Sequence, residues 1–265
     1  MGSEAIAGHA AGVPFLALAP AGGARADAPV VLAWHLADPP RTEAAFAVAV
    51  PLDGLDAWRI YLGLPLYGTR LPEGGMDEIM RLASEDVVLN LHGPTAEGAA
   101  REAGPALAEL RERLGLGDGP LGVLGGSIGA AAAQLVMAES GLQVAAAVLV
   151  SPLIRLRDAV AAGERRYQFG YTWSPASEAV ADRLDFVARA GELAGVPTLL
   201  VVGEEDDEGF IAAARELAAA RGADAELALI AGMGHALAEE PGIDQTPHAA
   251  QADRRATDWF ARHLA

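Results

Sequence analysis

Short runs of apolar residues alternate along the chain with longer stretches rich in Ala, Leu, Arg and Glu. Strands buried on both faces have continuous apolar sequences, whereas helices that cover a sheet are apolar on one side only. The alternation therefore predicts an α/β fold, a mostly parallel central sheet flanked by helices. The predicted strands are residues 30–34, 58–62, 121–124, 144–150, 198–202 and 225–230. The predicted helices are residues 99–114, 128–140, 209–221 and 247–264.

Turn-forming and capping residues mark the ends of several predicted elements. Gly141 and Gly222 each follow a predicted helix, where a left-handed residue commonly ends the helix. Thr246 and Pro247 are typical of an N-cap followed by a first-turn proline. The Ala-, Gly- and Pro-rich start of the chain predicts only an antiparallel edge strand over residues 15–18.

No repeat or low-complexity linker divides the sequence, so we expect a single domain over residues 1–265. Residues 152–195 lie between two late predicted strands and are too long for an ordinary connection. We expect them to form a small cap or lid inserted in the domain, called the cap segment below.

The cap segment contains a cluster of aromatic residues. Every second residue from 167 to 173 is aromatic, and an extended chain would place these rings on one face. The rings are Tyr167, Phe169, Tyr171 and Trp173. Two roles fit this pattern. The rings either line an apolar pocket for a substrate or fasten the cap to the sheet.

Composition excludes several classes of function. The formal charge is −17, from 36 acidic and 19 basic residues, which disfavours nucleic acid and anionic membrane surfaces as partners. The chain has no Lys, which excludes a Walker-type phosphate loop and a Schiff-base lysine. It has no Cys, which excludes disulfides, thiolate zinc sites and a cysteine nucleophile. No apolar run is long enough to span a membrane and no secretory signal is visible, so we expect a soluble, cytoplasmic protein.

The most informative local pattern is the sequence Gly-Gly-Ser-Ile-Gly at residues 125–129. It has the form G-x-S-x-G and lies between a predicted strand and an Ala-rich predicted helix. Such a strand–turn–helix exposes the Ser127 hydroxyl above the sheet and directs the N-terminus of the helix towards it. The alternative is an ordinary glycine-rich turn, for example one that holds a phosphate. The pentapeptide alone does not choose between them.

A nucleophilic serine needs a base and a group that orients the base, and the sequence offers both. The predicted strand at 198–202 is followed by a run of five acidic residues at 204–208. The predicted strand at 225–230 is followed by a short loop that ends in His235. The carboxyl ends of parallel strands meet at one edge of a sheet, so an acid and His235 would gather beside Ser127.

Four segments in this order make the chain resemble the α/β-hydrolase superfamily over roughly residues 30–260. They are the sequences Tyr-Leu-Gly-Leu-Pro-Leu-Tyr-Gly at 61–68, Gly-Gly-Ser-Ile-Gly at 125–129, Gly-Glu-Glu-Asp at 203–206 and Gly-Met-Gly-His at 232–235. The resemblance implies a serine hydrolase that works through a Ser-His-Asp triad.

The resemblance also implies a role for each residue of that triad. Ser127 would be the nucleophile, and His235 the general base and then the acid towards the leaving group. Asp206 would hold the imidazole in its productive tautomer. Asp207 and Glu205 stay open as alternatives, because the run of five acidic residues blurs the register.

The same resemblance implies an oxyanion hole made of two backbone N–H groups. Ile128, which follows the serine, would supply one. Leu36 or Ala37, after the strand at 30–34, would supply the other. Many members of the superfamily have His-Gly there, but in this chain His35 is followed by Leu36, so the position of the second donor stays open. We interpret His35 as a residue that orients this loop.

The function we expect is the hydrolysis of a small to medium carboxylic ester through an acyl-serine intermediate, with a small acyl substrate and neither a metal nor an organic cofactor. A thioesterase or peptidase with the same triad is an alternative, as is a non-catalytic ligand-binding protein of this fold. The acidic surface argues against CoA thioesters, unless the cap arginines form a local basic patch. Those arginines are Arg155, Arg157, Arg165 and Arg166.

Overall fold

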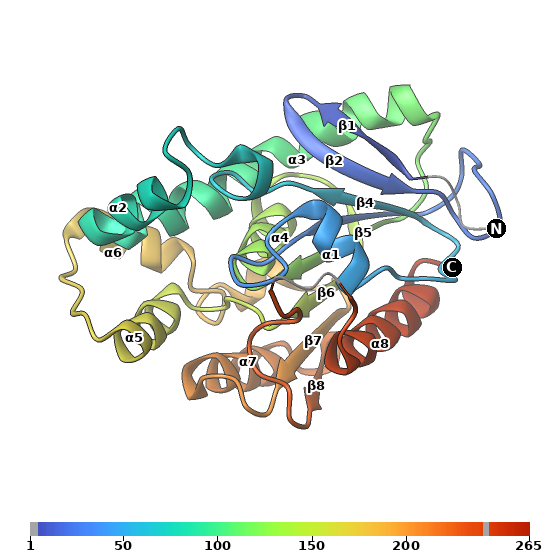
Figure 1. Cartoon of the computed structure of the whole chain (residues 1–265). Helices are drawn as coiled ribbons and strands as arrows, with labels where there is room; N and C mark the ends of the chain where they lie inside the picture. Colours follow the sequence, from blue (N-terminus) through green and yellow to red (C-terminus); the bar gives the residue numbers. More distant parts are fainter. Residues whose placement is uncertain (1–4, 241–243) are drawn as a thin grey trace.

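The computed structural model describes residues 5–240 and 244–265, and within them eight strands form one sheet (Figure 1). The strands are β1 (Ile6–Ala10), β2 (Val13–Leu18), β3 (Val30–Trp34), β4 (Trp58–Leu62), β5 (Leu121–Gly126), β6 (Val144–Val150), β7 (Thr198–Gly203) and β8 (Ala225–Ile230). Their spatial order is β1-β2-β4-β3-β5-β6-β7-β8. β2 runs antiparallel to β1 and β4, and all the other pairs are parallel, which confirms the predicted mostly parallel sheet.

The strands predicted from apolar runs are all present. β3, β4, β6 and β8 have the predicted bounds, while β5 and β7 extend slightly further and end in glycine. Every residue of β3, β4, β5 and β7 is buried. This burial on both faces explains why these strands are apolar at nearly every position instead of alternating. The exceptions are Thr198 in β7 and Arg59 in β4, whose buried guanidinium donates to backbone carbonyl oxygens.

The N-terminal prediction is partly wrong. Residues 15–18 do lie in an antiparallel strand, β2, but β1 forms the edge of the sheet. β1 and β2 are joined by a tight turn in which Ala11 and Gly12 have φ of 48° and 81°. Positive φ at both central residues is typical of the two-residue turns that match the twist of a hairpin. Most of β1 is exposed, so no apolar run predicted it.

Helices lie on both sides of the sheet. They are α1 (Glu43–Ala49), α2 (Gly75–Val87), α3 (Gly93–Leu114), α4 (Ile128–Glu139), α5 (Leu156–Tyr167), α6 (Pro175–Arg183), α7 (Glu208–Arg221) and α8 (Pro247–His263). Short 3₁₀ turns occur at Gly68–Arg70, Ala190–Leu193 and Gly222–Asp224, and a π-helical turn at Val88–His92 joins α2 to α3. Among the described residues, no helix combines the length and apolar character needed to cross a lipid bilayer.

The four predicted helices are present, with one clear difference. α4, α7 and α8 lie within one residue of the predicted bounds, whereas α3 begins at Gly93 instead of residue 99. Pro94 lies in the first turn of α3, where a backbone N–H is not needed. The capping prediction for α8 is confirmed, because the Thr246 side chain accepts a hydrogen bond from the Ala249 N–H. α1, α2, α5 and α6 were not predicted.

Successive residues of the central strands point to opposite faces and pack into two clusters. Val30, Leu32 and Trp34 join the cluster that contains residues of α3, α4 and α7. Val31 and Ala33 join the cluster that contains residues of α1 and α8. The two-residue side-chain period of a strand thus produces a sheet that is covered on both faces.

The cap segment contributes α5 and α6, which lie with α2 on the side of the molecule away from the two termini (Figure 1). Its buried side chains Leu156, Val160 and Phe186 belong to the same apolar cluster as α3, α4 and α7. The cap segment therefore packs into the core of the sheet on that face.

Gly203, the last residue of β7, brings two loops at the carboxyl edge of the sheet into close contact. A Cβ atom at this position would lie 2.0 Å from the Met233 carbonyl oxygen, in the loop after β8. Real Cβ atoms do not approach a backbone oxygen so closely, and the obstacle is backbone that cannot rotate away. Only glycine therefore allows the loops after β7 and β8 to touch.

We expect Gly203→Ala to destabilise the fold by about 1–3 kcal/mol, because the added methyl group forces these loops apart. The matched control is Gly163→Ala within α5, where an added Cβ makes only an ordinary van der Waals contact with the Phe169 ring at 3.7 Å. This control should stabilise the protein by about 0.5–1 kcal/mol through helix propensity. Urea unfolding of the two variants checks the prediction, and equal effects would contradict it.

Candidate active site

Ser127 lies in the turn between β5 and α4, at the carboxyl edge of the sheet. Its backbone has φ 48° and ψ −116°, a conformation that side-chain-bearing residues rarely adopt. Neighbouring backbone holds it there, since the Ser127 N–H donates to Val150 O at 3.0 Å and Ser127 O accepts from the Leu153 N–H at 3.1 Å. The strained turn is thus anchored from the end of β6.

The glycines of the turn are required by close packing. A Cβ at Gly125 would lie 2.4 Å from Gly129 O, and one at Gly126 would lie 2.3 Å from the side chain of Leu36. A Cβ at Gly129 would lie 2.4 Å from the carbonyl oxygens of both Trp34 and His35. The start of α4 therefore packs directly on the backbone at the end of β3.

Ser127, His235 and Asp206 form one hydrogen-bonded array. Ser127 Oγ is 2.8 Å from His235 Nε2. His235 Nδ1 is 2.9 Å from Asp206 Oδ2 and 3.0 Å from Oδ1. The ionised carboxylate can only accept, so Nδ1 carries the proton and Nε2 faces the serine hydroxyl as an acceptor. The Asp206 side chain is 1% exposed and that of His235 is 16% exposed, so the array is largely shielded from water.

The geometry distinguishes Asp206 from its acidic neighbours. Among the described residues, Asp206 is the carboxylate that lies within hydrogen-bond distance of His235. The side chain of Asp207 instead pairs with Arg165 of α5 and caps α7 by accepting from the Gly209 N–H. The Asp207 N–H donates to Asp206 Oδ1 at 2.7 Å. The acidic run is therefore divided into residues that point in different directions.

His35 holds the loop after β3. It is fully buried, its Nε2 lies 3.2 Å from the Leu64 N–H group and its Nδ1 lies 2.7 Å from Leu36 O. The Leu64 N–H must donate, so Nε2 accepts and the proton on Nδ1 is donated to Leu36 O. Burial lowers the pKa of His35 to about 4. The neutral ring therefore ties this loop to the segment after β4.

Three backbone N–H groups near Ser127 are candidates for an oxyanion hole. They belong to Leu36, Ala37 and Ile128, and within the described part of the chain none of them donates a hydrogen bond. Ile128 is also the first residue of α4, where the helix dipole is positive. The choice between Leu36 and Ala37 stays a prediction.

The aromatic residues of the cap segment do not share one face, so that prediction is wrong. α5 extends to Tyr167, and Gln168 then adopts a left-handed conformation, so the chain is not extended there. The side chains of Tyr167 and Phe169 are exposed. Tyr171 and Trp173 pack edge to face at 4.9 Å against the core. The packing of this second pair favours the fastening role over a pocket that all four rings would line.

Two neighbours of the array were not predicted. The Phe210 ring lies 4.5 Å from the His235 ring, centroid to centroid, and Arg165 reaches Asp207. Phe210 follows the acidic run on the first turn of α7, and Arg165 lies in the cap segment. No local sequence pattern indicates either contact. The contact of Phe210 with His235 and that of Arg165 with Asp207 each join elements that are distant in the sequence.

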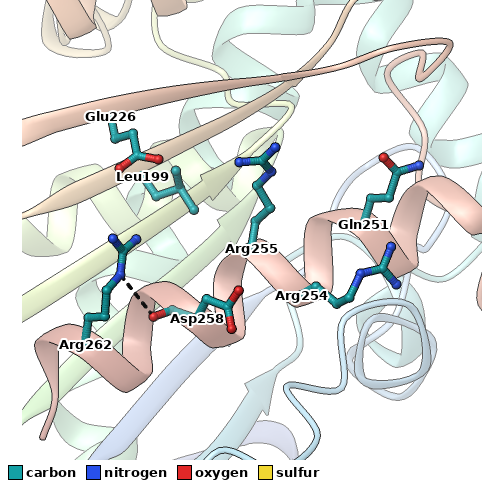
Figure 2. Close-up of a pocket in the computed structure, with 7 residues that line it drawn as sticks. All are labelled: Leu199, Glu226, Gln251, Arg254, Arg255, Asp258 and Arg262. Carbon is teal, nitrogen blue, oxygen red and sulfur yellow. Dashed lines mark hydrogen bonds between the residues drawn. The ribbon is translucent and has the colours of Figure 1, made fainter.

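A separate groove of about 310 Å³ lies along α8 (Figure 2). It is lined by Leu199, Glu226, Gln251, Arg254, Arg255, Asp258 and Arg262. Leu199 and Glu226 pair near the starts of β7 and β8, whereas Asp206 and His235 follow the ends of these strands. The groove is therefore at the opposite edge of the sheet from the array.

Solved structures superpose on the whole chain. A dienelactone hydrolase from Anabaena variabilis is 19% identical, with a TM-score of 0.60 over 99% of this chain and 98% of that chain. A cold-adapted esterase from an Arctic intertidal metagenomic library is 19% identical, with a TM-score of 0.62 over 98% and 93%. An acylaminoacyl peptidase from Pyrococcus horikoshii is 15% identical, with a TM-score of 0.69 over 100% of this chain and 42% of that one.

These structures share the α/β-hydrolase fold, and this chain has the same fold. The predicted resemblance is thereby confirmed at the level of architecture. No protein-family model matches the sequence, and no curated protein matches it either.

The buried His35 should make stability depend on pH. Its folded pKa of about 4 lies below the ordinary value of 6.5, so the unfolded chain takes up this proton first as the pH falls. Stability is therefore full above pH 6.5 and is lost towards pH 4, by about 3 kcal/mol for this group. Urea unfolding across that range should show that the unfolding free energy of His35→Gln depends less steeply on pH than that of the wild type. The difference in slope should correspond to the uptake of about one proton on unfolding. An unchanged slope would contradict the prediction.

Proposed function

We propose that this protein is a serine hydrolase that cleaves small to medium carboxylic esters through an acyl-serine at Ser127. The observation that carries the proposal is the continuous array from Ser127 Oγ through His235 to Asp206, with each step at 2.8–3.0 Å. A structural glycine-rich turn has no need of a histidine and a buried carboxylate in line with its serine. The array therefore favours the catalytic interpretation of the turn.

The geometry supports the following sequence of steps. His235 Nε2 accepts the hydroxyl proton as Ser127 Oγ attacks the ester carbonyl carbon. The resulting imidazolium is stabilised by the Asp206 carboxylate and gives its proton to the departing alcohol oxygen as the ester C–O bond breaks. Water then attacks the acyl-serine with His235 again as base, and this releases the acid and regenerates Ser127.

Backbone N–H groups would stabilise the negative oxygen formed in each attack. Ile128 supplies one donor, and Leu36 or Ala37 supplies the second. Each such donor is worth about 3–4 kcal/mol in other hydrolases. The close packing of Gly129 on the backbone of Trp34 and His35 brings these segments together before any substrate binds.

The fold and the cap charges bear on the substrate class. Solved structures of this fold include an esterase and a dienelactone hydrolase, which agrees with an ester substrate. The cap arginines do not form the free basic patch that a CoA thioester would need. Each of them is paired with at least one acidic residue: Arg155 with Asp158, Asp185 and Glu216, Arg157 with Asp182, Arg165 with Asp207, and Arg166 with Asp38.

A peptidase is the second candidate. The structural likeness to a puromycin-hydrolysing peptidase from Mycobacterium tuberculosis and to the acylaminoacyl peptidase, each with a TM-score of 0.69, favours it. The chain spans only 40% and 42% of those two proteins. Turnover of p-nitrophenyl esters, acyl thioesters and aminoacyl amides, compared on one enzyme preparation, separates the candidates.

We expect a fluorophosphonate probe to label the wild type, and Ser127→Ala to abolish both labelling and ester hydrolysis. The matched control is Ser151→Ala. Ser151 is also a buried serine with positive φ at the end of a neighbouring strand, but its hydroxyl has no hydrogen-bond partner among the described residues. Labelling that persists in Ser127→Ala, or a folded wild type that is not labelled, would contradict the proposal and favour a ligand-binding role.

The acid of the array is tested by comparing two isosteric variants. Asp206→Asn should lower kcat by on the order of 10³–10⁴-fold, because an amide cannot hold His235 in the required tautomer. The kcat of Asp207→Asn should stay within about tenfold of the wild-type value, because Asn keeps the helix cap and the backbone N–H that donates to Asp206. The opposite ranking would assign the role to Asp207.

A further inference from the structure

The last turn of helix α5 in the cap segment contains two adjacent arginines that reach two loops of the candidate site. Arg165 Nε lies 3.1 Å from Asp207 Oδ2 and its Nη2 lies 2.5 Å from Oδ1. Arg166 Nη1 lies 3.4 Å from Asp38 Oδ1, in the loop after β3. The Arg165 fork is the stronger of the two, because two parallel charge-assisted hydrogen bonds fix direction as well as distance. The single long contact of Arg166 contributes less.

Asp207 connects this fork to the array. Its side chain accepts from Arg165 and, at 2.9 Å, from the Gly209 N–H at the start of α7. Its backbone N–H donates to Asp206 Oδ1 at 2.7 Å. Hydrogen bonding to Arg165 lowers the pKa of Asp207, which keeps the pair charged. Arg165 thus holds the Asp207 side chain from the cap segment, and the first turn of α7 holds the Asp207 carbonyl oxygen through the Phe210 and Ile211 N–H groups. The Asp207 N–H in turn contacts Asp206.

The Asp206 carboxylate has few such supports. Among the described residues, its hydrogen-bond donors are His235 Nδ1 and the Asp207 N–H. The direction of the carboxylate therefore depends on one backbone group outside the array. A group that fixes the Asp207 backbone also fixes the carboxylate that orients His235.

We propose that Arg165 is a positioning residue, which holds the Asp207 N–H against Asp206 and so couples the placement of the cap segment to the orientation of His235. The rate effects of this coupling rest on the proposed hydrolase function. The orientation of His235 does not, because the hydrogen bonds exist whether or not the protein turns over an ester. The two ideas can therefore fail separately.

The chain offers a matched control for a loosened cap. Arg183 of α6 makes the same kind of fork, with Nε 3.2 Å from Glu139 Oε1 and Nη2 2.5 Å from Oε2 at the end of α4. The side chains of Arg183 and Arg165 are 40% and 56% exposed, so both pairs are partly open to solvent. Arg183→Gln removes this fork together with the ion pair between Arg183 and Glu97, while Arg189 still binds Glu139, and it does not touch Asp207.

The experiment compares wild type, Arg165→Gln, Asp207→Asn, the double variant and Arg183→Gln. The first readout is the rate of fluorophosphonate labelling at Ser127. The second is the low-field proton resonance of His235 Nδ1–H in the NMR spectrum, assigned by its loss in Asp206→Asn. The resonance reports the His235–Asp206 hydrogen bond without requiring any reaction.

We expect Arg165→Gln to slow labelling by about fivefold, the most that a partly exposed ion pair supports, and to shift or broaden the resonance. Asp207→Asn should do the same, and the double variant should be no worse than either one, because both changes remove one pair. Molar salt should slow the wild type towards the Arg165→Gln rate. Arg165→Lys should restore only part of the rate, since it keeps the charge but loses the fork.

If Arg165→Gln is labelled at the wild-type rate and its His235 resonance is unchanged, the positioning role is overturned and the proposed function stays intact. An equal loss in Arg183→Gln would also overturn it, because general loosening of the cap would then be the cause. If the wild type is not labelled but the resonance still depends on Arg165 and not on Arg183, the positioning role stands and the proposed function fails.

Discussion

The candidate site depends on the direct backbone contact between the start of α4 and the end of β3. Gly129 lies so close to the carbonyl oxygens of Trp34 and His35 that no side chain fits between them. This contact sets the position of the helix N-terminus and the distance from Ile128 to the loop at Leu36, beside the Ser127 turn that hydrogen bonds from the end of β6 hold in its strained conformation. A change at this one contact would move the parts of the site together.

Next to that contact, two neighbouring residues of the acidic loop after β7 have different partners. Asp206 points inward to His235, where it is almost completely buried, while Asp207 points outward to Arg165. The chain has a formal charge of −17 and therefore many surface carboxylates. Such carboxylates keep a protein in solution without needing an arginine partner. In this loop the arginine partner matters because its direction is transmitted through one peptide bond to the buried carboxylate.

The cap segment shows where local sequence patterns lose their value. The spacing of Tyr167, Phe169, Tyr171 and Trp173 is that of a strand, yet the chain is helical up to Tyr167 and turns at Gln168. A long-range contact, and not the alternation of aromatic residues, sets the position of Tyr171, because its hydroxyl donates to Asp86 Oδ1 at 2.6 Å. Packing against α2 and the core overrides a two-residue period when no neighbouring strand is available to pair with.

The sequence by itself determined the architecture and the order of the candidate residues. Buried parallel strands need apolar runs, and a nucleophile turn needs glycines. Both features can therefore be recognised in short segments of the sequence. Only the tertiary structure decided which carboxylate contacts His235, which residue Arg165 pairs with, and which strand forms the N-terminal edge of the sheet. These outcomes depend on contacts between segments far apart in the chain, where a change of one residue in register reverses the direction of a side chain and no local pattern records the choice.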